Sequence, residues 1–312
     1  MAAGVTGTAQ INQAVRRFLA ESRYTLQERP GVVKSSITRE RLPEGQGPSV
    51  NIPKYGTVST YALTEGVDMA QAQQITDTMM TITPAEFGAQ VVVSDLNLMQ
   101  AKDSLLRVFG KILAESFDRQ QDQTLCDDFD SFSVALGADG TVLTVGHLMA
   151  AGAQLRGQRA ADGTAGRGGE MAPGPYVAVI TSSHNHSLQK TLVGHVAGAV
   201  VQASGGTASM GEAPNMGNTG SANRVEFTIP GLGMQVKIDD NINKATDDTA
   251  KGAVFSPQAT ILVEHGAGPD VEKERDASLR AWELNFVGRW ARGEYNDGWG
   301  REMLFESARP TS

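Results

Sequence analysis

The stretch SDLNLMQAKDSLLRVFGKILAESFDRQQDQTLCDDFD, from Ser94 to Asp130, decides the fold. Its large apolar residues recur at steps of three and four, which is the spacing of one face of a helix. These residues are Leu98, Met99, Leu105, Leu106, Phe109, Ile112, Leu113 and Phe117. No proline interrupts the run. The pattern predicts a single helix roughly 50 Å long, on which other elements can pack along its whole length.

The residues before this helix favour a strand. Thr83-Pro84-Ala85-Glu86 is typical of a helix start. However, Gly88 and the β-branched run Val91 to Val93 disfavour a helix there. We therefore predict a strand from Met79 to Val93 and a helix cap at Ser94 or Asp95.

Composition narrows the class of protein. The 312 residues are 40% hydrophobic, enough for a real core, and include 35 glycines, which indicates many turns. The net charge of -8 excludes a generally basic surface that would bind nucleic acid through its phosphates. The one cysteine, Cys126, cannot form an intramolecular disulfide, and we expect it to be a core residue. The sequence contains no signal peptide and no apolar run long enough to predict a membrane span.

The first seventy residues are predicted to extend away from a core. A short amphipathic helix around Ile11 to Leu19 follows a flexible start, and its arginines are nearly balanced by glutamates. From Val32 to Glu65 the chain is β-prone on both sides of the turn Pro43 to Pro48, which predicts a long hairpin. Because this hairpin has few large apolar residues, we expect it to lie against a neighbouring molecule.

A second module is predicted from Ser133 to Lys251. Thr144 caps one helix, Tyr176 to Ile180 form a buried strand, and Ser182 or Ser183 caps a second helix. Residues 203–223 are a low-complexity loop, and two strands follow on either side of Pro230 to Gly233.

The last third returns to strand patterns. They are Ala253 to Val263, Ser278 to Trp290 and Arg301 to Phe305. These strands have no helix of their own to cover them, so we expect all three to pack against the long helix. The first domain would then be discontinuous in sequence, with the second domain inserted into it.

The motifs that could carry chemistry are weak. His184 and His186 are two residues apart and so do not share a helix face. Asp239 to Asn243 begins like a calcium loop, but Lys244 and Ala250 occupy its glycine and glutamate positions. The Asp127, Asp128 and Asp130 carboxylates are expected to be a solvated helix end. We therefore predict no catalytic, cofactor or metal site, and a protein that contacts other proteins.

The order of these elements resembles that of the major capsid protein of tailed bacteriophages, the Hong Kong 97 type of shell fold. LPEGQGPSVNIPKYG (Leu42 to Gly56) and LTEG (Leu63 to Gly66) are similar to the extended-loop region of one branch of that family. The strand that enters the long helix in that family is similar to ITPAEFGAQVVVSDL (Ile82 to Leu96). A step from strand to helix in its inserted domain is similar to PYVAVITSSHNHSLQ (Pro175 to Gln189). Residues 253–305 resemble the returning strands.

The resemblance implies an α+β fold of the Hong Kong 97 type. Its parts are an N-terminal arm, an extended β-hairpin loop, a peripheral domain made of the long spine helix with a β-sheet, and an inserted axial domain. The corresponding ranges are 1–31 for the arm, 32–70 for the extended loop, 71–132 with 253–312 for the peripheral domain, and 133–252 for the axial domain.

The resemblance also implies a function. Copies of the chain would self-assemble through hexamers and pentamers into the icosahedral shell that encloses the double-stranded DNA genome of a tailed phage. The protein would be assembled in the host bacterial cytoplasm and end in the virion, without contact to a membrane. Its partners would be further copies of itself and a portal protein, and both a separate scaffolding protein and a decorating protein are compatible with it. The packaged DNA would be enclosed without specific binding.

Charged residues on the hairpin and near a domain edge are the candidate contacts between subunits. They are Arg39, Glu40, Arg41, Asp270, Glu272, Lys273, Glu274 and Arg275. Because exposed ion pairs contribute little individually, we expect them to set the register of a contact more than its strength. The alternative for each of these residues is a simple solvated charge.

Two other functions are compatible with the sequence. An encapsulin-like compartment has the same type of shell fold and would enclose a protein cargo in place of DNA. A soluble hydrolase would need a pocket that joins His184 or His186 to carboxylates.

Overall fold

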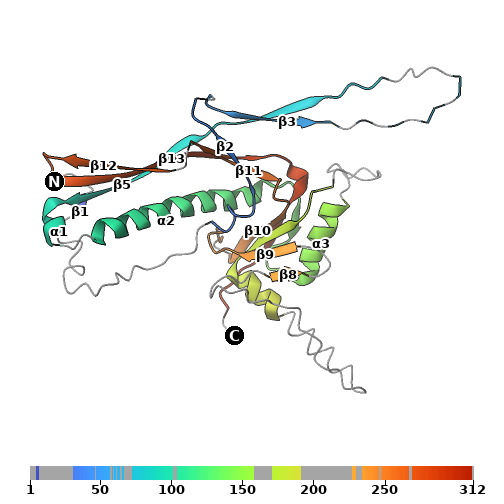
Figure 1. Ribbon diagram of the computed structural model, residues 1–312. Helices are drawn as coiled ribbons and strands as arrows, with labels where there is room; N and C mark the ends of the chain where they lie inside the picture. The colour runs from blue at the N-terminus through green and yellow to red at the C-terminus, as the bar shows by residue number, and fades with distance from the viewer. Residues whose placement is uncertain are drawn as a thin grey trace, which may run out of the picture.

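The computed structural model describes most of the chain. The described residues are 5–6, 31–45, 47–56, 58, 60, 62–63, 65–66, 72–100, 104–157, 171–190, 227–229, 234–245, 247–266 and 269–310, with only the backbone for 5–6, 97–98, 100, 104–107 and 227–229. The fold is mixed α and β, with two larger sheets and a two-stranded arm (Figure 1). The predicted helix at Ile11 to Leu19 and the predicted loop at 203–223 lie outside the described residues.

The first sheet is long and narrow. Its strands are β1 (Val5–Thr6), β5 (Ala85–Ser94), β13 (Ala281–Glu294), β11 (Thr260–His265), β2 (Thr38–Leu42) and β12 (Asp270–Asp276). β13 is the central strand. β5 pairs with one side of it, while β11 and β12 pair end to end with the other side. The first described residues, which we expected to be flexible, instead form β1 beside Val92 and Val93.

Within the described residues, the predicted long helix corresponds to α1 (Asp95–Gln100), α2 (Ser104–Asp127) and the 3-10 turn η1 (Asp128–Ser131). Leu113 and Phe117 of α2 are buried, and the Phe117 ring meets the Phe286 ring edge-on, with 5.2 Å between centroids. A Cβ at Gly288 would lie 2.4 Å from Phe117, so glycine permits this close approach. Ile112 is exposed, contrary to the predicted stripe, because the buried row runs at steps of four through Leu113 and Phe117.

The second sheet lies at the C-terminal end of α2. Its strands are β6 (Ala135–Gly137), β14 (Gly300–Glu306), β10 (Thr249–Phe255), β7 (Tyr176–Ile180), β9 (Met234–Ile238) and β8 (Phe227–Ile229). One face packs on the C-terminal end of α2 through Leu125 and on η1 through Phe129. The other face packs on α3 (Val145–Arg156) and on the helix at 182–190. The predicted cap at Thr144 forms a capping box with His147.

The returning segment Arg301 to Phe305 does not join the first sheet, and the segment Ala253 to Val263 is divided between the two larger sheets. β14 pairs with β10 over seven residues, and its Met303 and Phe305 belong to the core under α3. Arg301 to Phe305 therefore belongs to the second sheet, whose opposite face packs on the end of the long helix. β10 and β14 pair across about fifty residues of sequence, and periodicity along one strand carries no information about such a partner. β10 also runs across the predicted domain boundary between 252 and 253.

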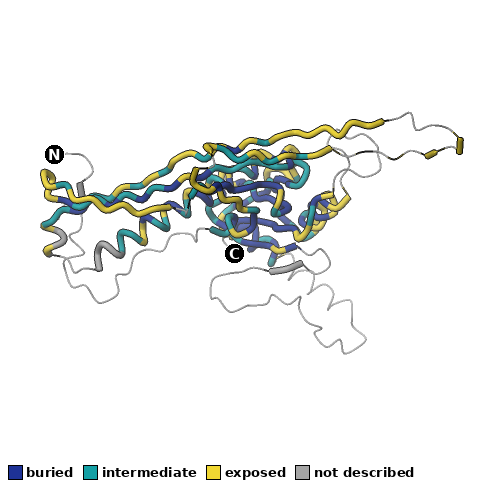
Figure 2. The backbone as a smooth tube through the Cα atoms, turned by 45° about the horizontal axis from the view of Figure 1, so that its top comes forward, coloured by how far each residue is buried: buried dark blue, intermediate teal, exposed yellow. Residues whose placement is uncertain are grey.

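The projecting arm has a different second strand from the one predicted. β3 (Val50–Tyr55) pairs with β4 (Asp77–Ile82), whereas β2 pairs in parallel with β11. The prediction of a hairpin within residues 32–70 is thus wrong. The turn at Pro43 to Pro48, with Gly45 and Gly47 at positive φ, instead carries the chain from one sheet to another. The predicted strand at Met79 to Val93 is two strands, since Pro84 has no N–H to donate. Figure 2 shows that the described part of the arm becomes exposed beyond its base, while buried residues gather where the two larger sheets meet.

Candidate assembly surfaces

The base of the arm is fixed to the first sheet by a small apolar cluster. Leu42, Ile82, Ile261 and Val263 are its buried members, and Met80 packs against it. A Cβ at Gly293 would lie 2.6 Å from Ile82, so β4 crosses β13 where that strand has no side chain. This cluster lies on the face of the sheet opposite to α2. The arm and α2 therefore flank the sheet from its two faces.

Beyond its base the arm exposes apolar side chains. Met79 is 62% exposed and Tyr55 is 67% exposed, and both lie on the face of β3 and β4 that is turned away from the basal cluster. Ile75 and Leu63 in the connecting loop are also exposed. A group of exposed apolar residues on a projecting element is typical of a surface that another molecule covers.

The predicted contact residues on β2 are partly used within the chain. Arg39 Nη2 lies 2.5 Å from Glu264 Oε2, and Lys34 Nζ lies 3.0 Å from the other oxygen of Glu264. This network fixes β2 to β11. Glu40 and Arg41 are exposed, and within the described residues neither forms an ion pair. Arg39 thus has an internal partner, while Glu40 and Arg41 remain candidates for contacts with another molecule.

A second buried carboxylate, which the sequence did not single out, joins the turn at residues 31–36 to the rest of the fold. Asp122 of α2 is fully buried, and its Oδ1 accepts hydrogen bonds from the backbone N–H groups of Val33 and Lys34 at 3.0 and 3.3 Å. Its Oδ2 accepts from Asn241 Nδ2 at 3.3 Å. The helix, the turn at residues 31–36 and the chain after β9 are therefore tied together at one side chain.

The other predicted contact residues form an exposed edge strand. Opposite residues of an antiparallel pair share a face, so the pairing of Lys273 with Leu284 places Lys273 and Arg275 on the α2 side of β12. Lys273 Nζ lies 4.2 Å from the centre of the Trp282 ring, and Arg275 Nη2 lies 3.0 Å from Asp95 Oδ2. The remaining charges, Asp270, Glu272 and Glu274, project from the opposite face.

This separation of charge restricts how the edge can meet another copy. If β12 paired antiparallel with β12 of a two-fold related copy in one plane, residues of the same face would meet, placing acid opposite acid. β2 lies along the same edge of the sheet, with Arg39 and Arg41 on the α2 side. Pairing β2 of one copy with β12 of another would therefore bring cations together. The charges therefore disfavour a coplanar contact of this edge with itself.

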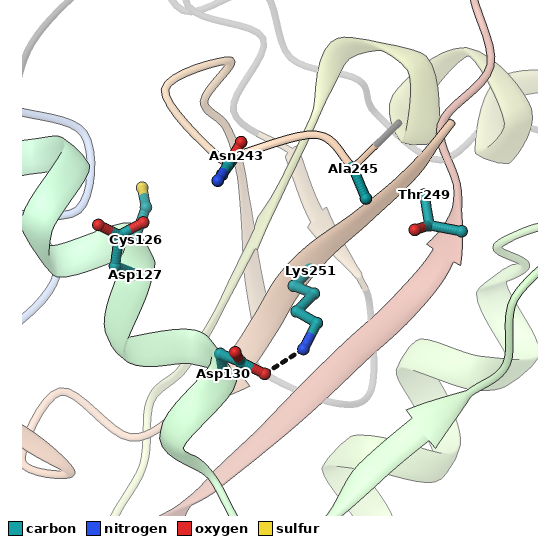
Figure 3. Close-up of a pocket in the computed structure, with 7 residues that line it drawn as sticks. All are labelled: Cys126, Asp127, Asp130, Asn243, Ala245, Thr249 and Lys251. Atoms are coloured by element: carbon teal, nitrogen blue, oxygen red, sulfur yellow. Dashed lines mark hydrogen bonds and ion pairs between the residues drawn. The ribbon is translucent and has the colours of Figure 1, made fainter. Parts of the chain in front are cut away.

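A cavity of about 440 Å³ lies between the end of α2, η1 and the chain that enters β10 (Figure 3). Seven residues line it: Cys126, Asp127, Asp130, Asn243, Ala245, Thr249 and Lys251. The Lys251 amine points to Asp130 and also lies 3.3 Å from Glu302. Hydrogen bonds to these carboxylates raise the pKa of Lys251. The amine is therefore a paired cation and a poor base.

The thiol in this cavity is equally unsuited to nucleophilic chemistry. Burial, with the nearby carboxylates of Asp239 and Asp122, raises the pKa of Cys126 well above its usual value. His184, a candidate for a hydrolytic site, is fully buried, and its Nε2 lies 3.2 Å from the carbonyl oxygen of Phe305. Burial lowers the pKa of His184. Its position is that of a core residue of the second sheet.

The described residues also give two general findings. None of their helices is long and apolar enough to cross a bilayer. In the same part of the chain, no group of three or more histidine, cysteine, aspartate or glutamate side chains is placed to hold a metal ion.

Comparison with solved structures gives extensive likeness of fold. The head structure of Helicobacter pylori bacteriophage KHP40 matches with a TM-score of 0.67 and 9% identity, over 97% of this chain and 98% of that one. The capsid of Ralstonia phage GP4 matches with a TM-score of 0.67 and 11% identity, over 95% and 96%. The capsid of the cyanophage P-SCSP1u matches with a TM-score of 0.64 and 13% identity, over 97% and 96%.

The chain has the fold of phage capsid proteins. The likeness covers nearly the whole chain and so extends across both larger sheets, α2 and the arm. No protein-family model matches the sequence, and no curated protein matches it. At identities near 10% the shared fold is visible in the arrangement of elements and not in the residues.

Proposed function

We propose that this chain is the major capsid protein of a tailed phage and that it forms an icosahedral shell of the Hong Kong 97 type around double-stranded DNA. The observation that carries the proposal is the fold shared with phage capsids over almost the full length of both chains. The exposed arm, whose described residues form no core beyond its base, supports it. In this proposal the arm lies on an adjacent subunit, and hexamers and pentamers join into a closed shell.

We keep the domain organisation proposed from the sequence but assign β10 and β14 to the axial domain. The peripheral domain contains the first sheet and the spine helix α2, and the axial domain contains the second sheet, including β10 and β14. The segment from 1 to 31 is the N-terminal arm, and the extended loop is β3 and β4 with their connection.

The proposed contacts between subunits use the charges that form no ion pair within the described residues. These are Glu40, Arg41, Asp270, Glu272 and Glu274. Since a coplanar two-fold contact would bring like charges together, we infer that the edge meets a different surface of the neighbour, as in a head-to-tail ring. A portal protein completes the shell, and a scaffolding or decorating protein is compatible with it.

The enclosed DNA is proposed to be confined without specific binding. The side of α2 that faces away from the sheets carries both signs of charge and neutral polar groups, among them Lys111, Ser116, Gln123 and Asp127. Because the chain carries a net charge of -8, attraction to DNA would not stabilise the shell, and its stability would come from contacts between proteins. A strongly basic inner face in the assembled particle would contradict this part of the proposal.

Electron microscopy of the purified protein, with size-exclusion chromatography alongside, tests the function. We expect closed shells of uniform diameter, or five-fold and six-fold rings. Nuclease-protected DNA in particles from infected cells supports a virion, whereas a protein cargo without DNA supports the encapsulin-like alternative. A stable monomer at high concentration, with and without the other head proteins, would overturn the shell.

The arm offers a sharper test through Met79→Asp. Met79 is exposed in the single chain, so the substitution should leave the unfolding midpoint unchanged, while a charge placed in a covered contact should reduce the assembled fraction by about tenfold or more. Ala138→Asp adds the same charge in an exposed turn far from the arm and serves as the control. Equal assembly of the two variants would contradict a covered arm.

A further inference from the structure

Two histidine rings lie against the buried side chain of Phe305 in β14. The ring of His147, in the first turn of α3, has its centre 4.8 Å from the centre of the Phe305 ring. The ring of His184, in the helix at 182–190, meets the Phe305 ring edge-on, with 6.4 Å between centres. These two helices cover the same face of the second sheet. Both covering helices are therefore joined to β14 at one side chain.

Phe305 is held closely within the sheet. It is fully buried and pairs with Ala250 of β10. A Cβ at Gly137 of β6 would lie 2.5 Å from the Phe305 ring, so β6 approaches it without a side chain in between. A change in the contacts of this ring therefore acts on three strands of the second sheet and on the two helices above them.

His184 is bound as a neutral ring with its proton on Nε2. Its Nε2 lies 3.2 Å from the carbonyl oxygen of Phe305, and a carbonyl oxygen can only accept, so Nε2 is the donor. In the neutral ring Nδ1 then carries no proton. Nδ1 is buried, and no described residue forms a hydrogen bond with it. A second proton at Nδ1 would therefore place a charge and an unbonded donor in the core.

His147 must also carry its proton on Nε2. The backbone N–H of Thr144 donates to His147 Nδ1 at 3.2 Å, and Thr144 Oγ1 lies 3.0 Å from the same atom. Because a backbone N–H can only donate, Nδ1 has no proton while this half of the capping box is formed. A proton there would break the bond and put a positive charge in the first turn of α3, which the helix dipole disfavours.

The charged groups nearest to His184 come from the chain that follows β9. Asp240 and Lys244 act on the ring with opposite sign, and their side chains lie 3.8 Å from each other. Asp240 Oδ1 also accepts hydrogen bonds from the N–H and the hydroxyl group of Ser182. Within the described residues, no carboxylate forms an ion pair with either histidine. A second proton on either ring would thus have no paired anion.

The other elements around the rings supply no anion either. α3, β6 and β7 contain no acidic residue. Glu302 and Glu306 alternate with Phe305 along β14 and so project from the other face of the strand. Arg301 shares the face of Phe305 but donates to Gln154, near the other end of α3. The groups that lie at the surface or in other bonds are Asp139, His186, Lys190, Asp247 and Lys251.

We propose that His147 and His184 form an acid-sensitive clamp on Phe305, which holds α3 and the helix at 182–190 on the second sheet at neutral pH and opens as the two rings take up protons. The geometry carries this inference, since His147 must accept at Nδ1 and His184 has no described partner for a proton at Nδ1. The clamp is a property of the folded chain and does not rest on the proposed shell function.

The direction of the titration agrees with the geometry. Burial lowers the pKa of His184 from its usual value of 6.5, although the hydrogen bond to the Phe305 carbonyl opposes the shift. A histidine whose pKa is lower in the folded than in the unfolded chain adds stability above the unfolded value, and this stability is lost as the pH falls toward the folded value. The clamp is therefore closed at neutral pH and loosens below pH 6.5.

His147→Gln combined with His184→Gln tests the clamp. Glutamine is neutral at every pH, completes an ordinary capping box with Thr144, and can donate to the Phe305 carbonyl. Hydrogen exchange of the full chain, corrected for intrinsic rates, gives the opening constant of the α3 amides. Between about pH 7.5 and about pH 5.5 we expect this constant to rise about tenfold or more in the unmodified protein, and about threefold or less in the double variant.

His186→Gln is the matched control, because His186 lies on the same helix as His184 but is half-exposed. It should keep the rise of the unmodified protein. Equal pH profiles for the double variant and the unmodified protein would overturn the clamp, as would a profile flattened to the same extent by the control. If the double variant does not fold, His147→Gln alone decides, since its rise should be smaller than that of the unmodified protein and an unchanged rise contradicts the clamp.

A second measurement needs no substitution at the two rings. Nitrogen-15 spectra of the histidine rings distinguish the two neutral tautomers, and both His147 and His184 should carry their proton on Nε2 at about pH 7.5. A proton on Nδ1 of either ring would overturn the clamp. Neither this result nor the exchange profile depends on whether particles form.

Discussion

Glu264 lies between Lys34 and Arg39 with 8% of its side chain exposed, and it joins β2 to β11. Burial alone would raise the pKa of Glu264, but the hydrogen bonds from Arg39 and Lys34 outweigh it and lower the pKa below 4.5. Nothing in the sequence around Arg39 indicates this partner, which is 225 residues away. A single glutamate inside a β-branched run is a signal that could have indicated a paired carboxylate.

Glu264→Gln is predicted to lower the free energy of unfolding at neutral pH by about 1–3 kcal/mol, because two cations lose their shared acceptor. A lowered folded-state pKa adds stability above the unfolded value and loses it as the pH falls through the folded value. The difference between variant and unmodified protein should therefore shrink in urea titrations below pH 4.5. An equal difference at about pH 7 and about pH 3 would contradict the role of the charge.

At the scale of elements, β12 is the strand that local sequence patterns concealed. Six of its seven residues are exposed, and its alternation of charge does not resemble a half-buried strand. It forms a strand because β13 offers a full ladder of hydrogen bonds along Ala281 to Val287. Its charges keep the free edge from pairing with a second copy.

Replacing Glu272 and Glu274 together by valine is predicted to promote self-association through this edge. The monomer should change in stability by no more than about 0.5 kcal/mol, since both side chains are exposed. Sedimentation and light scattering against concentration would measure the association. Glu65→Val with Asp139→Val removes the same charge from exposed positions outside the strands, and equal association of this control would rule out the edge as the cause.

At the scale of the whole molecule, α2 connects two sheets into one body. Its middle packs under the first sheet through Leu113 and Phe117, and its C-terminal end packs on the second sheet through Leu125, together with Phe129 of η1. The apolar cluster runs without a break from Phe286 to Phe255. The two sheets should therefore unfold together.

Leu125→Ala is predicted to lower the free energy of unfolding by about 2–5 kcal/mol through the lost contacts and the cavity left behind. Hydrogen exchange should accelerate in both β13 and β7, because each rests on the same helix. Leu188→Ala, an equally buried leucine in the separate cluster under α3, should act mainly on the second sheet. Faster exchange confined to the second sheet in Leu125→Ala would contradict a shared core.

By itself, the sequence determined the elements whose signals are local. The long helix, the cap at Thr144, the buried strand Tyr176–Ile180 and the strand pair β8–β9 follow from spacing, capping residues and apolar runs within a few residues. The order of elements also led to the capsid fold. Tertiary structure alone decided that β3 pairs with β4, that β14 joins the second sheet and that Asp128 meets Arg292. These contacts join residues far apart in the chain, and their free energy comes from burial and pairing across elements, which no periodicity within one element records.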